Sequence, residues 1–142
     1  MVIESLIPPE TILAYRETEF RVFSETLVIL RIAEKNDVLL DMYKTIGSDK
    51  CAFITACNPL GQLLDDHENI KLQRQLADEL RLRSLNFIAG EGKHPVGDWP
   101  GEPSFLVFGL SLEAAKSLGK KLDQNAIVWC DLEAVPQLVL LR

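Results

Sequence analysis

The chain has 142 residues, of which 47% are hydrophobic and 25% charged, and its formal net charge is −6. This length is typical of one domain with a continuous core, so we expect a single domain over residues 1–142. The acidic balance argues against nucleic-acid binding, because that function needs clustered Lys and Arg to contact phosphates.

The apolar residues predict neither a membrane span nor a secretory signal. No apolar run approaches the roughly 20 residues that cross a bilayer, and the start MVIESLIPPE lacks the basic segment and long apolar core of a signal peptide. We therefore expect a cytoplasmic protein. Its three cysteines lack metal-ligand spacing, so we expect buried free thiols, with Cys51 and Cys57 facing the same side of a sheet.

Residues 1–50 predict an N-terminal extension that precedes the main core. Prolines favour a helix start, and short alternating apolar runs favour strands. The predicted elements are a short helix from Pro8 and Pro9 through Ala14, strands at 20–23 and 26–32 with a turn near Ser24, and a helix at 37–44 that ends before Gly47.

From residue 51 the pattern is one of apolar strands and amphipathic helices. The segment CAFITAC, residues 51–57, is apolar on both faces, as in a strand that is covered on both sides. Asp65 is a candidate N-cap for a helix with an apolar stripe at Leu72, Leu76, Ala77 and Leu80. The later elements are a strand at 86–89, a loop at 90–104, a strand at 105–110, a helix capped by Ser111, and strands at 126–130 and 138–141.

The order strand, helix, strand, strand, helix, strand in residues 51–130 predicts an α+β fold, a ferredoxin-like split βαβ plait with extra elements at both ends. In such a plait, the connections at 58–66, 90–104 and 124–125 meet at one end of the sheet. The helix that starts near Asp66 also points its free N–H groups to this end, where they can bind an anion.

The loop at 90–104, GEGKHPVGDWPGEPS, is a candidate site because long loops in compact domains are often functional. Its glycines and prolines can equally serve only to shape a hairpin, with Trp99 covering the core. Glu91 and Glu102 are candidate catalytic residues for acid–base work. Together with His94 and Asp98 they could also ligate a metal, but the spacing is not diagnostic, so we predict no metal and no cofactor.

Several further motifs support the same region. AFITACNP at 52–59, Asn69, GEG at 90–92, WPGEPSFLV at 99–107 and QNAIVW at 124–129, together with AYRETEFRV at 14–22, resemble the bacterial DUF3293 family of unknown function over nearly the whole chain. The resemblance implies no activity that can be carried over. Cys57 stands where we expect a large aromatic residue, and Asp123 where we expect Gly, which predicts a larger pocket and an altered helix C-cap respectively.

The function predicted from these patterns is a small binding or regulatory module, with a polar ligand or a partner protein at the loop end of the sheet. A hydrolase or nuclease-type enzyme that uses Glu91 and Glu102, or a structural or interaction protein, remain alternatives. Amide side chains can hydrogen-bond an uncharged ligand or the local backbone. The predicted ligand-binding residues are Asn58, Asn69, Glu91, Trp99, Glu102, Ser104, Gln124 and Asn125.

Overall fold

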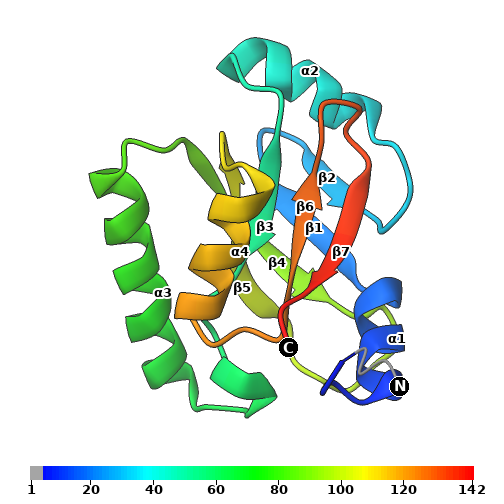
Figure 1. The fold of residues 1–142 in the computed structure, drawn as a ribbon, viewed down its shortest axis with the longest axis vertical. Helices are drawn as coiled ribbons and strands as arrows, with labels where there is room; N and C mark the ends of the chain where they lie inside the picture. Colours follow the sequence, from blue (N-terminus) through cyan, green and yellow to red (C-terminus); the bar gives the residue numbers. More distant parts are fainter. Residues whose placement is uncertain (1–4) are drawn as a thin grey trace.

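The computed structural model describes residues 5–142, which form an α+β fold with four α-helices and one antiparallel seven-stranded sheet (Figure 1). The elements are α1 (Pro9–Glu17), β1 (Glu19–Phe23), β2 (Leu27–Leu30), α2 (Asp37–Ile46), β3 (Cys51–Ile54), the short 3₁₀ helix η1 (Pro59–Gly61), α3 (Asp66–Leu82), β4 (Phe87–Lys93), β5 (Glu102–Phe108), α4 (Leu112–Lys121), β6 (Ala126–Cys130) and β7 (Pro136–Leu140). The strand order is β2-β1-β4-β5-β3-β6-β7.

Local capping fixes the starts of three helices. The Asp65 carboxylate accepts a hydrogen bond from the Glu68 N–H at 2.8 Å, and Ser111 Oγ accepts one from the Ala114 N–H at 3.1 Å. Both predicted N-caps are thereby confirmed. Asn36 caps α2 in the same way, and that helix ends at Gly47 with φ of 80°, the left-handed conformation that glycine adopts without strain.

The central strand β3 is buried on both faces, as predicted, although it ends at Ile54 rather than at residue 57. On one face, α3 and α4 pack against the sheet through an apolar layer that includes Leu80 and Leu118. On the other face, Leu39 and Tyr43 of α2 pack against a second apolar layer. In Figure 1, α3 and α4 lie together on one side of the sheet, and α2 lies at one end.

The sheet curls into a half-barrel that is joined at the α2 end. Although β2 and β7 are the two edge strands, the Ala33 N–H donates to the Pro136 carbonyl at 2.8 Å, and the Asn36 N–H donates to the Ala134 carbonyl at 3.0 Å. At the opposite end, α1 lies beside the ends of the strands (Figure 1). The α+β class and the added strands on both sides of the core are confirmed, but the sheet as a whole is this curled half-barrel.

The predicted loop at 90–104 is too long, because β4 and β5 occupy its two ends. β4 runs to Lys93 and β5 begins at Glu102, with Gly90 paired to Ser104, and only residues 94–101 connect the two strands. Gly90 lies within a strand, where it permits close packing, and not in a turn. A Cβ atom at Gly90 would lie 2.3 Å from the Arg21 carbonyl oxygen.

The three cysteines are buried and unpaired in the described structure, but Cys51 and Cys57 do not share a sheet face. Cys51 pairs in register with Cys130, whereas Cys57 lies beyond the end of β3. The Cys57 thiol instead approaches the Pro103 carbonyl at 3.5 Å, and burial raises its pKa. At the other departure from the family pattern, Asp123 has φ of 55°, a conformation in which glycine would be unstrained.

The helices of the described chain, residues 5–142, all fall short of what crossing a bilayer requires in length or hydrophobicity. The longest of them, α3, has 17 residues.

Candidate functional site

A cavity of about 530 Å³ lies inside the curled sheet, at the end beside α1. Its floor is apolar and comes from inward-facing strand residues. The floor residues are Phe20, Phe53, Val128 and Leu138. Its polar wall is formed by Tyr15, Asn58, Glu102, Gln124 and Asn125. Segments far apart in the sequence therefore enclose one space.

The sheet register explains why space remains above this floor. Phe20 pairs with Gly92 across β1 and β4, and both positions face inward. A Cβ atom at Gly92 would meet its nearest neighbours at 3.8 Å or more, which is ordinary van der Waals contact. Phe20 and Phe53 pack edge to face, with ring centroids 5.3 Å apart. The absence of a side chain at Gly92 keeps the cavity open beside these rings.

Asn58 is the centre of the polar wall. Its Nδ2 donates to Glu102 Oε2 at 2.7 Å, and its Oδ1 accepts from the Leu64 N–H at 2.9 Å and from Asn69 Nδ2 at 2.8 Å. Asn69 Oδ1 in turn accepts from the Asn58 N–H at 2.9 Å. Asn58 itself has φ of 48°, a conformation that Asn tolerates better than most residues. The network holds the amide of Asn58 toward the cavity.

Burial raises the pKa of Glu102, and the hydrogen bond from the Asn58 side chain, together with the Trp99 side chain, offsets only part of that increase. Within residues 5–142, no Lys, Arg or His forms an ion pair with this carboxylate. The groups that bind Glu102 are therefore neutral donors, and its negative charge is not compensated.

Replacing Glu102 with Gln should remove a fall in stability that the native protein shows as pH rises. Because the folded-state pKa of Glu102 lies above its unfolded value, the native state retains a proton that the unfolded chain has already lost. This contribution is fully present below the unfolded pKa of about 4.3 and is lost as pH rises through the folded pKa. Urea midpoints measured from about pH 4 to 8 should fall less in Glu102→Gln than in the native protein. Identical pH profiles would contradict the prediction.

Tyr15 joins the N-terminal helix to the polar wall. Its hydroxyl accepts a hydrogen bond from Asn125 Nδ2 at 3.1 Å, and Asn125 Oδ1 accepts one from Arg142 Nη1 at 2.7 Å. Burial raises the pKa of Tyr15, and the nearby negative charge of Glu102 adds to the increase. Gln124 Nε2 donates to the Cys57 carbonyl at 3.0 Å, which joins the turn before β6 to the segment that follows β3.

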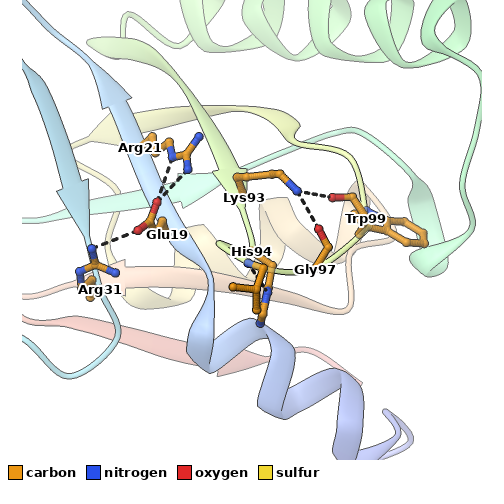
Figure 2. A network of polar contacts seen from close by, with 8 residues as sticks. Glu19, Arg21, Arg31, Lys93, His94, Gly97 and Trp99 are labelled. Carbon is orange, nitrogen blue, oxygen red and sulfur yellow. Dashed lines mark hydrogen bonds and ion pairs between the residues drawn. The ribbon is translucent and has the colours of Figure 1, made fainter.

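The connection at 94–101 is held by Lys93, as Figure 2 shows. Lys93 Nζ donates to the carbonyls of Gly97 and Trp99, each at 3.0 Å. His94 lines the cavity, and its Nε2 lies 3.7 Å from Glu17 Oε1 on α1. Trp99 is 45% exposed, so it forms part of the rim and does not cover the apolar core.

Of the eight residues predicted to bind a ligand, six line this one cavity, and their binding role stays a prediction. They are Asn58, Trp99, Glu102, Ser104, Gln124 and Asn125. Asn69 lies behind the wall, where it positions Asn58. Ser104 Oγ donates to the Glu102 carbonyl at 3.0 Å.

Glu91 does not line the cavity. It lies in β4 beside Gly92, and successive strand residues point to opposite faces of a sheet. Since Gly92 pairs with Glu102 and both face the cavity, Glu91 faces away from it. The structure therefore does not bring Glu91 and Glu102 together in this cavity, and a catalytic role for either residue stays a prediction. Within residues 5–142, no three potential His, Cys, Asp or Glu ligands gather at one point.

Two further features expected at this end of the sheet lie outside the cavity. The first turn of α3 is not part of the cavity lining, and it carries Asp66 and Glu68 beside the capping Asp65, which opposes anion binding there. Cys57 does not line the cavity either, so its small size does not enlarge it.

Tyr15 and Gln73 were missed in reasoning from the sequence. Gln73 Oε1 accepts from the Ala56 N–H at 2.9 Å, while its buried Nε2 has no partner within the described chain. Gln73 lies one helical turn after Asn69, so the two amides together hold residues 56–58. Its position within the apolar stripe of α3 was the available signal. Nothing near Tyr15 in the sequence indicates its contact with Asn125.

Comparison with known proteins identifies the chain through one match. The model of the family described as "Protein of unknown function (DUF3293)" matches residues 54–127, just over half of the chain. No curated protein and no solved structure is significantly similar to it. The matched segment includes most of the polar wall but not α1. This chain belongs to the DUF3293 family.

Proposed function

We propose that this protein is a small-molecule-binding module whose ligand occupies the cavity beside α1. The observation that carries the proposal is the convergence of Asn58, Glu102 and Asn125 above an apolar floor. Ligand sites are typically cavities of about 300–1,000 Å³ with mainly apolar walls and a few polar groups that orient the ligand. Both the size and the lining of this cavity fit that description.

The arrangement favours binding over the hydrolase and nuclease alternatives. Carboxylates that divide acid and base roles must lie close to the same reacting atoms. Glu102 faces the cavity, whereas Glu91 faces away from it, so the lining supplies one of the two expected groups. The groups around Glu102 include the amides of Asn58 and Asn125 and the Tyr15 hydroxyl, which recognise ligands by hydrogen bonds.

A variant that fills the cavity tests this proposal. Gly92→Val would project a branched side chain into the cavity, while Gly92→Ala adds one methyl group and serves as the matched control. Both variants and the native protein would be screened by thermal shift against one library of small polar and aromatic fragments. A ligand at about 100 times its Kd stabilises the native state by about 2.7 kcal/mol, which raises the midpoint by several degrees.

The expected result is a set of fragments that raise the midpoint of the native protein and of Gly92→Ala but not that of Gly92→Val. Fragments that stabilise all three proteins equally would bind elsewhere and would refute the proposed site. If no fragment stabilises the native protein and Gly92→Val still folds normally, the structural or interaction role is favoured.

We also infer that residues 51–130 retain a ferredoxin-like plait within the larger sheet. The order β4-β5-β3-β6 and the antiparallel pairing of neighbouring strands support this inference. So does the packing of α3 and α4 on one face. In this interpretation β1, β2 and β7 extend the plait, and its curl creates the ligand cavity.

A further inference from the structure

We propose that the ligand of this cavity is an organic cation, an amine or amidinium group on an apolar body, whose charged group binds the Glu102 carboxylate. The inference rests on the proposed binding function and specifies the chemical class of the ligand. It is argued from the charges, hydrogen bonds and aromatic rings of the described residues.

The charged groups in the cavity lining have one predominant sign. Among residues 5–142, the lining includes Glu10 and Glu102 but no Lys or Arg. Arg142 binds the Oδ1 of Asn125 outside the lining, and His94 lies against Glu17. An anionic ligand would therefore approach two carboxylates in a lining whose one imidazole, His94, already lies against Glu17 and which offers no Lys or Arg.

Glu102 has the capacity to bind a cation. A carboxylate offers about four acceptor positions, and Asn58 Nδ2 occupies one of those on Glu102. Burying a carboxylate without a positive partner is costly, and a ligand cation would supply that partner. The resulting hydrogen bond is charge-assisted and therefore stronger than a neutral one.

The floor suits the rest of such a ligand. Phe20 and Phe53 present aromatic rings, and Val128 and Leu138 add aliphatic surface. Aromatic faces attract cations as well as apolar groups. A molecule with a cationic group at one end and an apolar body at the other would match both parts of the cavity.

Three probes of similar shape but different charge distinguish the effect of charge on binding from that of shape. They are 2-phenylethylamine, 2-phenylethanol and 3-phenylpropanoate. Each would be titrated into the full chain at neutral pH, and its Kd measured by NMR chemical-shift changes. The titrations would be repeated with Glu102→Gln, which keeps an oxygen for Asn58. Glu91→Gln is the matched control, because it removes a carboxylate from the opposite face of the same strand pair. Gly92→Val reports whether a probe binds in the cavity.

We expect the amine to bind most tightly, to lose about tenfold or more in affinity in Glu102→Gln, and to be unaffected by Glu91→Gln. Gly92→Val should abolish its binding. If the alcohol binds as tightly as the amine and Glu102→Gln changes neither, the cavity binds ligands but the cation class is wrong. If no probe binds, the inferred cation class is wrong, and the fragment screen decides the proposed function separately. If binding survives Gly92→Val, the probes bind outside the cavity and this inference is overturned.

Discussion

Replacing Gly90 with Ala is expected to lower the free energy of unfolding by about 3 kcal/mol, the upper end of the range for overpacked positions. The added Cβ would lie 2.3 Å from the Arg21 carbonyl oxygen and 3.0 Å from the Phe53 ring. The first of these atoms belongs to the backbone of β1, so relief requires the two strands to move apart. Urea denaturation of both proteins would measure the difference.

Gly92→Ala is the matched control, and it should raise the free energy of unfolding by about 0.5 kcal/mol. Gly92 lies in the same strand and on the same face, but its added Cβ would meet neighbours at 3.8 Å or more. The gain comes from the smaller conformational freedom of Ala in the unfolded chain. Equal effects of the two substitutions would show that β1 and β4 do not pack as closely at Gly90 as described.

Asn58→Ala should lower the free energy of unfolding by about 4 kcal/mol, because it leaves several buried polar groups without partners. The Leu64 N–H and the Asn69 amide would each lose an acceptor, and Glu102 would lose a donor. Asn58 is 5% exposed, so water reaches these groups poorly. Thermal and urea unfolding monitored by circular dichroism would measure the loss.

Asn58→Gly separates the backbone contribution from that of the side chain. Glycine adopts the positive φ of this position without strain, so Asn58→Gly should be about 1 kcal/mol more stable than Asn58→Ala while still losing the side-chain bonds. A small effect of both substitutions would mean that the amide network contributes little, and that Asn58 is free to move in the cavity wall.

The helices and the apolar strands could be predicted because their signals are local. Asp65 and Ser111 cap helices through residues only three positions away. The apolar run at 51–54 identifies a strand covered on both faces. These features depend on neighbours in sequence, which the sequence displays directly. The same holds for Gly47, where a helix needs a left-handed residue at its end.

The extent of β4 and β5 could not be predicted, because Gly90 and Gly92 have roles set by distant residues. The sequence does not distinguish a glycine in a turn from a glycine that packs closely against a neighbouring strand. Only the packing of β1 against β4 distinguishes them. The error then carried to Glu91, since the side of the sheet that a residue faces follows from the strand to which it belongs.

Part of the candidate site could be predicted because its position follows from the order of the elements. Asn58, Glu102 and Asn125 meet because the connections at one end of an antiparallel sheet converge, and the order of elements predicts that convergence. Tyr15 was beyond such reasoning. It meets Asn125 across 110 positions of the chain, and the curl of the sheet brings the N-terminal helix to that place.

The uneven closure of the half-barrel has a kinetic consequence. Hydrogen bonds at Ala33 and Asn36 join the two edges at one end, so opening the sheet there would disrupt strand pairing. At the other end α1, Pro9–Glu17, contains no buried residue, and the Tyr15–Asn125 bond is its side-chain link to the polar wall. Undocking this helix costs far less than global unfolding. A solute would therefore gain a wider route into the cavity when α1 undocks, while the strands remain paired.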